Sequence, residues 1–396
     1  MKLDLLYEID VPKPWPDKPF PYGQREAEQK AYREAFEQIK LADRYGFNTI
    51  WSVEHHFREG RSHSPSSEVV LGALSQVTEN LRLGFGVTLC PPGFIHPARV
   101  AEKVATVDVL SGGRVEWGIG RSTPMEQKAF GVNTETSKED MYETARTVVD
   151  MWGTEYYERD DDWMKFPRRM VTPKPVQDPH PACWQAAVSA GSAKQAGELG
   201  LGLLSFAIMQ PLSKMAEHIN DYREGQKNCT KPLTKVHTNK VSAYTLVHCA
   251  DTFERAERNG IWDSVWWWYQ HLAEFTLEWE FPHFSQEEKD RLFPMLSKHA
   301  AGELNPKTFN DVHMIIVGDP DQCYAKFKEY EKLGVDQVIC YVQFGFLSHA
   351  SIMRTIELLG THVIPALEQD GIQVTQRVKA KGESDPSDTT LSSIVD

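Results

Sequence analysis

Short apolar runs that predict β-strands alternate with amphipathic stretches that predict helices along almost the whole chain. Strands that alternate with helices form βαβ units and a parallel sheet. Most of the runs are apolar throughout, which is typical of strands covered on both faces. Eight strand–helix units predict a closed (β/α)8 TIM barrel, because an open doubly wound sheet usually has fewer strands. The expected strands are residues 3–9, 47–54, 81–89, 114–120, 183–189, 202–207, 240–249 and 337–345.

The expected helices lie between these strands, at residues 26–45, 66–79, 97–110, 137–152, 192–199, 211–226, 319–333 and 349–368. We assign residues 1–370 to a single barrel domain with insertions in its βα loops, and the polar residues 371–396 to a flexible tail. A further apolar run at 312–318 predicts a short extra strand. Three stretches interrupt the alternation, and loops this long are usually functional lids or interface elements. They are residues 11–24, 154–182 and 260–311.

The acidic balance of the chain restricts its partners. The formal net charge is −13, from 43 basic and 56 acidic side chains. A surface this negative repels nucleic acids and anionic membranes, so we expect neither as a partner. The first residues, MKLDLLYEID, lack the basic and apolar regions of a signal peptide. No apolar run reaches about 18 residues, the length that predicts a membrane span.

The six cysteines are scattered and include no CxxC pair. In a chain of this length, that pattern predicts reduced thiols and a cytoplasmic location, with neither a disulfide framework nor a zinc site. Four of them lie in or beside apolar runs and are expected to pack in the core: Cys90, Cys183, Cys249 and Cys340.

Polar side chains gather where the expected strands end, which is where a (β/α)8 barrel carries its active site. A barrel with a purely structural role has no need of so many polar groups at one rim. The pattern therefore favours an enzyme, but it does not identify the reaction. These positions are Glu8, Asp10, Glu54, His55, His56, Thr88, Gly118 to Arg121, Ser189 to Ser192, His248, Gln343 and Phe344.

Two of these positions favour a ligand that carries a phosphate. The SAGS loop (Ser189 to Ser192) follows a strand and begins a helix, where small residues and a helix N-terminus suit an anion. The alternative is that Ser192 is only the N-cap of helix 192–199. Arg121 ends the fourth strand and either pairs with the same phosphate or forms a surface salt bridge. The sequence contains neither a P-loop nor a dinucleotide-binding glycine motif.

Glu54, His55 and His56 come at the end of the second expected strand. Adjacent side chains leave a strand on opposite faces, so at most one of the two histidines readily faces the barrel mouth. Histidine works as an acid or base near neutral pH. It is also a metal ligand, but EHH is not the HExxH zinc motif and no third ligand is evident. The alternative for either residue is a histidine that packs or holds the loop.

Four segments, in this order, resemble the luciferase-like flavin-dependent monooxygenases. They are TIWSVEHHFREG, IHPARVAEKVATVDVLSGGRVEWGIGR, SAGSAKQAGELGLG and IELLGTHVIPAL. The resemblance covers residues 1–250 and 312–369, but it includes neither the proline-rich stretch after the first strand nor the WWWY segment. It implies a (β/α)8 barrel that binds reduced FMN (FMNH2) at its mouth.

The resemblance also assigns roles to individual residues. Arg121 is expected to meet the FMN phosphate, together with Tyr142 and the SAGS loop. The flavin ring is expected to lie against the third strand, where the family has a non-prolyl cis peptide that we place at Gly86–Val87. Asp108 and Arg114 belong to the shared motif but are expected to be structural. The full set of expected cofactor-binding residues is Gly86, Val87, Thr88, Gly118, Arg121, Tyr142, Ser189, Gly191 and Ser192.

His55 matches the catalytic histidine of the family. The resemblance implies that reduced FMN reacts with O2 to form a C4a-hydroperoxyflavin, and that His55 manages proton transfer while one oxygen atom passes to the substrate. The expected substrate is a small, fairly apolar organic molecule such as an aldehyde, a ketone or a terpenoid. The expected partners are a separate NAD(P)H-dependent flavin reductase and a second copy of the chain, because family members usually dimerise through the helices beside strands two and three.

Two alternatives are left open by the sequence. Relatives with the same fold use the deazaflavin coenzyme F420 for hydride transfer, although EHHF fits the FMN branch better. The second alternative is a non-catalytic flavin-binding protein, against which His55 and the phosphate residues argue. The run Trp266 to Tyr269 either roofs a substrate pocket or, as we favour, packs as part of an amphipathic helix or a subunit contact.

Overall fold

Eight parallel strands close into a barrel in the computed structural model, which describes residues 1–12, 22–206 and 209–369. The strands follow one another around the barrel, and the pairs β8–β9, β9–β11 and β11–β1 complete the ring. The (β/α)8 TIM barrel predicted from the sequence is therefore confirmed. In order around the ring, the strands are β1 (Lys2–Tyr7), β2 (Thr49–Ser52), β3 (Arg82–Leu89), β4 (Val115–Gly120), β7 (Cys183–Ala187), β8 (Gly202–Ser205), β9 (Val241–Cys249) and β11 (Gln337–Tyr341).

A further short strand pairs with the barrel without entering the ring. β10 (Ile316–Gly318) lies parallel to the last residues of β9, with Ile316 opposite Val247. The extra strand expected at 312–318 is thus confirmed over its second part only. Residues 312–315 instead form the turn after helix α12 (Lys307–Asp311), in which His313 has a φ of +60°.

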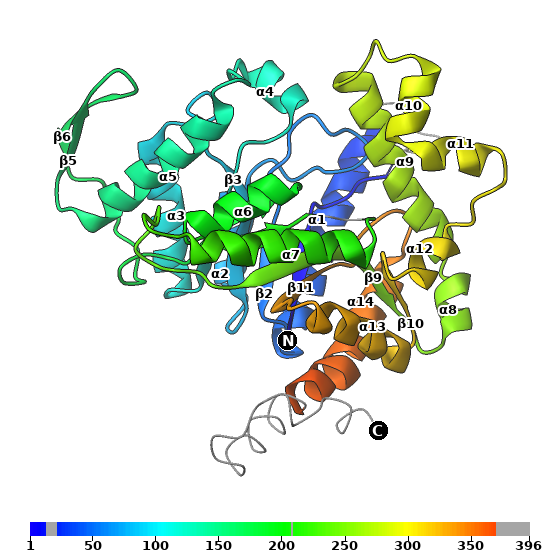
Figure 1. Ribbon diagram of the computed structural model, residues 1–396. Helices are drawn as coiled ribbons and strands as arrows, with labels where there is room; N and C mark the ends of the chain where they lie inside the picture. The colour runs from blue at the N-terminus through cyan, green and yellow to red at the C-terminus, as the bar shows by residue number, and fades with distance from the viewer. Residues whose placement is uncertain (13–21, 207–208, 370–396) are drawn as a thin grey trace.

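Helices surround the barrel at the positions that the sequence pattern predicts (Figure 1). The last one departs from the expected continuous helix, because a π-helical turn, η1 (Leu359–Val363), interrupts it. In this turn a Cβ on Gly360 would come within 2.3 Å of the Cβ of Tyr45, so the two segments are in close contact. The helices of the outer layer are α1 (Tyr22–Arg44), α2 (Ser67–Ser75), α3 (Pro97–Ser111), α5 (Ser137–Gly153), α6 (Ala190–Glu198), α7 (Leu212–Lys227), α13 (Pro320–Lys332) and α14 (His349–Leu358).

Two pairs of an indole and a carboxylate fill the barrel near the amino-terminal ends of its strands. Trp51 donates its ring N–H to Asp4 at 3.0 Å, and Trp184 donates to Glu116 at 2.7 Å. The two indole rings pack edge to face, with their centroids 5.7 Å apart. Burial raises the pKa of Asp4 to about 6, although the hydrogen bond from Trp51 opposes the shift. This end of the barrel is packed core, and the loops that can hold a ligand lie at the opposite end, the barrel mouth.

The three stretches that interrupt the alternation differ in structure. Residues 154–182 hold an antiparallel hairpin of β5 (Tyr157–Asp160) and β6 (Lys165–Arg169), which projects away from the barrel (Figure 1). Of residues 11–24, the part 13–21 lies outside the described residues, as does the expected tail 371–396.

Residues 260–311, expected as a long loop, are largely helical. The physical reason is the spacing of apolar residues: Ile261, Val265, Trp268, Ala273 and Leu277 recur every three to five positions and are buried on one face of α9. The helices of this stretch are α9 (Ile261–Trp279), α10 (Gln286–Leu292), α11 (Pro294–Ala300) and α12. Two more short helices follow β4 and β9, namely α4 (Pro124–Phe130) and α8 (Phe253–Arg258).

All six cysteines are free, and the four that were expected in the core, Cys90, Cys183, Cys249 and Cys340, are buried there. Within the described ranges, no cluster of three or more His, Cys, Asp or Glu side chains is placed to hold a metal ion. No helix within these ranges is long and apolar enough to cross a membrane.

Asp108 and Arg114 tie α3 to the segments beside it. The buried carboxylate of Asp108 accepts hydrogen bonds from the backbone N–H groups of Val115, Val176 and Gln177 at 2.7–3.3 Å. Arg114 donates to four backbone carbonyl oxygens, those of Ser75, Thr78, Leu81 and Ser111. Because backbone groups engage both side chains, they act in the fold, as the sequence analysis expects.

We predict that Asp108→Asn lowers the free energy of unfolding by about 2–3 kcal/mol, because the amide group turns a donor toward N–H groups that have lost their acceptor. Urea unfolding followed by circular dichroism measures the change. The matched control is Asp251→Asn, since Asp251 forms an exposed salt bridge with Arg354 and such pairs contribute only about 0–1 kcal/mol. Equal losses in the two variants would contradict the structural role of Asp108.

Candidate active site

His55 and Glu126 meet at the barrel mouth from two different loops. His55 follows β2, and Glu126 lies in α4, which follows β4. Nδ1 of His55 lies 3.0 Å from Oε1 of Glu126. Because a carboxylate only accepts hydrogen bonds, Nδ1 carries the proton, and Nε2 of the neutral ring is the acceptor. Glu126 therefore holds His55 in the tautomer that can take up a proton at Nε2.

The carboxylate of Glu126 is the centre of a hydrogen-bond cluster. It also accepts the backbone N–H of His56 at 2.6 Å and the hydroxyl of Thr123 at 2.8 Å, and the hydroxyl of Ser122 donates to it as well. Burial by itself raises the pKa of Glu126, but the charge that His55 carries when protonated, its hydrogen bond, the charge of Arg58 and the other donors hold it well below the ordinary value. Glu126 is thus a buried anion at neutral pH.

Arg58 brings a positive charge close to this carboxylate. Its Nε lies 3.9 Å from Oε1 of Glu126, and its side chain is buried. The guanidinium carbon lies over the ring of Phe275 in α9, 5.4 Å from the ring centroid. Helix α9 therefore packs on the loop that carries His55.

His56 is turned toward other partners. Its Nε2 lies 3.5 Å from Oε1 of Glu54, and its ring meets the ring of Phe130 edge on, with centroids 4.8 Å apart. The strand β2 ends at Ser52, earlier than the expected residue 54, so both histidines lie in the following loop. Of these two histidines, only His55 is hydrogen-bonded to Glu126 through its side chain.

Arg121 and the SAGS loop follow the neighbouring strands β4 and β7. Arg121 is exposed and donates from Nη1 to Oγ of Ser137 at 3.1 Å. Within the described part of the chain it forms no salt bridge, which was its alternative role. Oγ of Ser189 accepts the N–H of Ser192 at 3.3 Å, and the two hydroxyl oxygens lie 2.8 Å apart. The proposal that Ser192 caps a helix at 192–199 is wrong, because the helix begins at residue 190 and Ser189 is its N-cap.

Gln185 in β7 connects the SAGS loop to Tyr142 in α5. The hydroxyl of Tyr142 lies 3.1 Å from Oε1 of Gln185, whose Nε2 donates to the carbonyl oxygen of Ser192 at 3.3 Å. Burial raises the pKa of Tyr142, and the hydrogen bond with Gln185 and the nearby charge of Arg121 oppose the shift. The residues that are expected from the sequence to bind a phosphate therefore lie in one region.

Strand β3 is irregular at the residues that are expected to contact the flavin ring. The Gly86–Val87 peptide bond is cis, as expected from the resemblance. A Cβ on Gly118 in β4 would lie 2.3 Å from the carbonyl oxygen of Phe85, so glycine allows the two strands to come close here. Gly118 is buried, so it contributes to this packing. Thr88 is fully buried, and its hydroxyl has no hydrogen-bond partner among the described residues.

These features fit a flavin mononucleotide. An exposed arginine, two hydroxyls and the N-terminus of α6, whose first turn contains no acidic residue, suit a phosphate. A Cβ on Gly191 would meet no atom within 4 Å, so the SAGS loop is open on that side. The orphaned hydroxyl of Thr88 is a buried polar group that a polar ring edge can satisfy.

His248, also expected at the rim, is packed away from these residues. Its Nδ1 lies 3.0 Å from the hydroxyl of Thr355, and its Nε2 lies 3.0 Å from the side-chain amide of Asn259. Burial lowers the pKa of His248 to about 4, so the ring is neutral at physiological pH. It holds β9 to α14 and is not part of the candidate active site.

The aromatic run of α9 divides between two roles. Trp266 stacks on His299 of α11, with ring centroids 3.6 Å apart, and the buried Trp267 packs within the helical layer. Trp268 lies over the barrel mouth, where its ring is 4.9 Å from the guanidinium of Arg61. The helix-packing interpretation fits Trp266 and Trp267, whereas Trp268 packs on Arg61 in the loop that presents His55.

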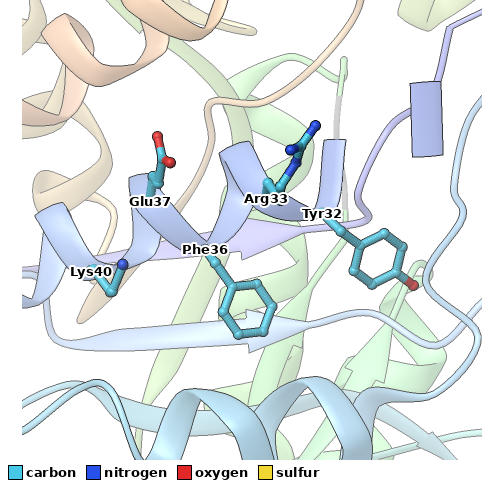
Figure 2. Close-up of a pocket in the computed structure, with 5 residues that line it drawn as sticks. All are labelled: Tyr32, Arg33, Phe36, Glu37 and Lys40. Atoms are coloured by element: carbon cyan, nitrogen blue, oxygen red, sulfur yellow. The ribbon is translucent and has the colours of Figure 1, made fainter. Parts of the chain in front are cut away.

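An open hollow of about 390 Å³ lies on the surface of α1 (Figure 2). In Figure 2, Arg33 and Glu37 lie on one side of the helix and Phe36 on the other. The hollow shares no residue with the His55–Glu126 pair or the SAGS loop, so it is not part of the candidate active site. Its lining residues are Tyr32, Arg33, Phe36, Glu37 and Lys40.

Glu126 and Gln185 are functional candidates that the sequence analysis missed. Thr123 and Glu126 form a capping box with a proline at the first helical position. That motif is readable in the sequence, but it does not reveal that the second carboxylate oxygen turns toward His55. Gln185 interrupts the apolar strand CWQAA, and a polar residue inside a barrel strand is the signal that could have identified it.

Comparison with known proteins identifies the family. A family model described as luciferase-like monooxygenase matches residues 18–337. The oxygenase component of the flavin-dependent trigonelline monooxygenase from Acinetobacter baylyi is 23% identical over 359 residues, covering 88% of this chain and 93% of that protein.

Solved structures share the fold. The oxygenating constituent of 3,6-diketocamphane monooxygenase from Pseudomonas putida, in complex with FMN, matches with a TM-score of 0.68 at 18% identity, over 92% of this chain and 98% of that one. The coenzyme F420-dependent tetrahydromethanopterin reductase from Methanopyrus kandleri matches with a TM-score of 0.62 at 21% identity, again over 92% and 98% of the two chains. Because the family model spans most of the chain and agrees with the barrel and its loops, this chain is an oxidoreductase that belongs to the luciferase-like monooxygenase family.

Proposed function

We propose that this chain is the oxygenase component of a two-component monooxygenase. It uses O2 and reduced FMN, supplied by a separate NAD(P)H-dependent flavin reductase, to oxygenate a small, fairly apolar organic substrate by way of a C4a-hydroperoxyflavin. One observation carries the proposal: the oriented His55–Glu126 pair lies at the same barrel mouth as Arg121 and the SAGS loop. The relative from Acinetobacter baylyi, which is itself an oxygenase component, supports the two-component organisation. The free cysteines are consistent with the proposed cytoplasmic location of the enzyme.

Arg121, Tyr142 and the SAGS loop are the proposed phosphate site. The guanidinium supplies charge-assisted hydrogen bonds, and the N-terminus of α6 favours the negative charge. Residues 86–88 form the proposed wall for the flavin ring, and Gly118 lets β4 pack beneath them. When bound, reduced FMN supplies the electrons and the carbon atom at which O2 is activated.

His55 is the proposed catalytic residue. Since Glu126 holds the Nδ1 proton, Nε2 takes a proton from the reacting partners and returns it. The buried charge of Glu126 stabilises the imidazolium that forms in between. Helix α9 covers this loop through Phe275 and Arg58 and so restricts the access of water.

We predict that Arg121→Ala weakens the binding of reduced FMN by about 1.5–3 kcal/mol, the range for hydrogen bonds to charged groups. An anaerobic calorimetric titration measures the affinity. Riboflavin, which lacks the phosphate, should bind the variant and the wild type alike. The matched control is Arg33→Ala, which removes an exposed arginine from α1. An unchanged affinity for reduced FMN in Arg121→Ala would take Arg121 out of the phosphate site.

We predict that His55→Ala leaves the affinity for reduced FMN nearly unchanged but slows product formation about 10²–10⁴-fold, the usual contribution of an acid–base residue. Stopped-flow absorbance after mixing with oxygenated buffer, together with product yield, measures the effect. His56→Ala is the control, because its side chain does not contact Glu126. Kinetics equal to the wild type in His55→Ala would rule out the catalytic assignment.

Glu126 is proposed to act through His55, and a double variant separates this role from a general loss of structure. Glu126→Gln should slow product formation, because the amide no longer holds the Nδ1 proton with a negative charge. The double variant with His55→Ala should lose no more than His55→Ala alone, since the two changes disable one unit. Fully additive losses would show that Glu126 acts independently of His55.

We propose that two copies of the chain associate through α2 and α3. These helices are neighbours, and Nε2 of Gln76 donates to the carbonyl oxygen of Leu110 at 3.2 Å. Four apolar side chains on or beside them are 46–66% exposed, and grouped apolar exposure of this kind marks interaction surfaces. They are Val69, Val77, Val109 and Leu110.

Leu110→Glu should therefore convert the dimer into a monomer, because burying an unpaired carboxylate in an apolar contact is strongly unfavourable. Size-exclusion chromatography with light scattering, at several protein concentrations, measures the mass. Val312→Glu, which alters a similarly exposed valine elsewhere, should leave the dimer intact. A wild-type chain that is monomeric at every concentration would contradict the proposal.

A second candidate function is hydride transfer with coenzyme F420, because solved enzymes of that type share this fold. The two candidates differ in their need for oxygen. Turnover with coenzyme F420 in the absence of O2 would favour hydride transfer. Substrate-dependent oxygen uptake with reduced FMN would favour the monooxygenase. Tight FMN binding without any substrate-dependent oxygen uptake would instead indicate a flavin-binding protein without catalysis.

A further inference from the structure

A second buried polar cluster lies at the barrel mouth, across the ring from the SAGS loop. It is built on β1, β9 and β11, whereas Arg121 and the SAGS loop follow β4 and β7. The proposed cofactor site and His55 make no use of it. Its members are Glu8, Asp10, Arg61, Tyr244 and Tyr341, each at most 6% exposed.

Within this cluster, Glu8 and Arg61 form an ion pair, although Oε2 of Glu8 and Nε of Arg61 are without a hydrogen bond among the described residues. Nη2 of Arg61 lies 3.1 Å from Oε2 and 3.2 Å from Oε1 of Glu8. The ring of Trp268 in α9 covers the same guanidinium at 4.9 Å. The pair is therefore electrically neutral as a unit, and it leaves the charge of Asp10 unmatched.

Asp10 is held in place by its backbone but not by its side chain. Its N–H donates to Oε1 of Gln343 at 3.1 Å, and its carbonyl oxygen accepts from Nε2 of the same amide at 3.2 Å. Both of its carboxyl oxygens are buried without a hydrogen-bond partner among the described residues. The preceding residue, Ile9, has a φ of +52°, a strained conformation for a β-branched residue.

Two tyrosine hydroxyl groups near Asp10 are also buried without a regular hydrogen bond. Tyr244 and Tyr341 are buried, and neither hydroxyl forms a hydrogen bond of ordinary geometry within the described ranges, although the Tyr341 hydroxyl lies near enough to Asp10 to stabilise its carboxylate. Their rings lie 5.7 Å apart and nearly parallel, at 28°. Phe206 packs against Tyr244 at 5.2 Å, and Phe344 packs against Tyr341 at 5.8 Å. The two tyrosines near the Asp10 carboxyl group thus belong to a cluster of four aromatic rings.

The chemistry of these groups selects the ligand. A buried carboxyl group without a compensating partner is unfavourable, and an uncharged apolar ligand would leave it so. An anion would be repelled by Asp10 and Glu8. A cation would match the Asp10 charge, and aromatic faces attract cations as well as apolar groups. The loop that carries Arg61 also carries His55, and the backbone N–H of His55 donates to the carbonyl oxygen of Ser64 at 3.3 Å. A ligand at Asp10 therefore lies beside the segment that presents His55.

We propose that Asp10, with Tyr244 and Tyr341, binds the positively charged group of the substrate. The substrate class is a small organic cation, either a protonated amine or an N-alkylated aromatic ring, whose apolar body lies among the aromatic side chains. This inference rests on the proposed oxygenase function, because it names the substrate that the flavin and His55 would act on.

The binding of a cation at Asp10 also releases a proton. Burial raises the pKa of Asp10 to about 8, the carboxylate of Glu8 adds to the shift, and Arg61 and Tyr341 oppose it. Burial keeps the pKa of Tyr244 and of Tyr341 well above the ordinary value, so both stay protonated. Helix α9 places the uncharged ring of Trp268 over Arg61, and Arg58 adds a further positive charge near Glu8 and Arg61. A cation favours ionised Asp10, so its binding near pH 7 releases a proton, and its affinity rises as the pH approaches 8.

The test uses the full chain loaded with FMN and two probes of matched shape, N-methylpyridinium and toluene. Calorimetric titration near pH 7, in two buffers of different ionisation enthalpy, measures the affinity and the protons released. We expect N-methylpyridinium to bind at least about tenfold more tightly than toluene, and Asp10→Asn to abolish that difference and the proton release. Tyr341→Phe should weaken the binding of N-methylpyridinium but leave the binding of toluene unchanged. Asp160→Asn, in the exposed hairpin strand β5, is the control and should match the wild type.

Equal affinities for the two probes, or an Asp10→Asn variant that binds N-methylpyridinium like the wild type, would overturn the inference. Circular dichroism confirms that each variant is folded before its titration is interpreted. The titrations are repeated without FMN, so that the two proposals are tested separately. Failure of FMN to bind would refute the proposed function, whereas loss of cation selectivity in an FMN-loaded chain would refute only the assignment of Asp10.

Discussion

The closure of eight parallel strands into one ring is the constraint on which the rest of this structure depends. Parallel strands end on the same side, so every βα loop is delivered to a single rim. His55 and Glu126 are 71 positions apart, yet they meet at 3.0 Å because their loops follow strands that belong to this ring. At the other end, Trp51 and Trp184 fill the barrel and bury their carboxylate partners. One packed end and one polar end are the direct result of closure.

The buried carboxyl groups of this chain differ in how many hydrogen-bond partners and positive neighbours they have. Asp108 and Glu126 are both buried and both saturated, the first by backbone N–H groups and the second by His55 and its neighbours. The pKa of Glu126 is lowered because its donors and positive neighbours outweigh burial. Asp10 is equally buried, but burial raises its pKa because too few partners oppose it. The number of partners, not burial alone, therefore decides whether such a carboxyl is a fixed charge or a group that can respond to a ligand.

Much of the fold could be predicted from the sequence, because the signals for it are local. The apolar runs became strands within a few residues of their expected bounds, and the motif residues Asp108 and Arg114 are structural. The start of α6 was misplaced by two residues, since SAGS is composed of small residues that carry no apolar period. The insertion 260–311 was taken for a long loop, except that an amphipathic helix or a subunit contact was favoured for Trp266 to Tyr269, which lie in α9.

The candidate site was predicted less completely, because its contacts join loops that are distant in the sequence. The capping box of Glu126 is visible as a pattern, but its bond to His55 depends on where the loop after β2 lies. In the same way, Glu8 and Asp10 were recognised as rim residues, but nothing in the sequence reveals that Arg61 neutralises one and leaves the other unmatched. Such information exists only once the ring has closed.

The insertion helix α9 links the two halves of the barrel mouth. Its Phe275 packs on Arg58, which neighbours Glu126, and its Trp268 packs on Arg61, which neutralises Glu8. Both arginines belong to the loop that presents His55, so one helix braces the proton-transfer pair and the Asp10 cluster at once. The family model spans α9, although the sequence motifs that point to a flavin do not include it. A substrate held at Asp10, as we propose, would therefore lie beneath the same helix that supports the loop of His55.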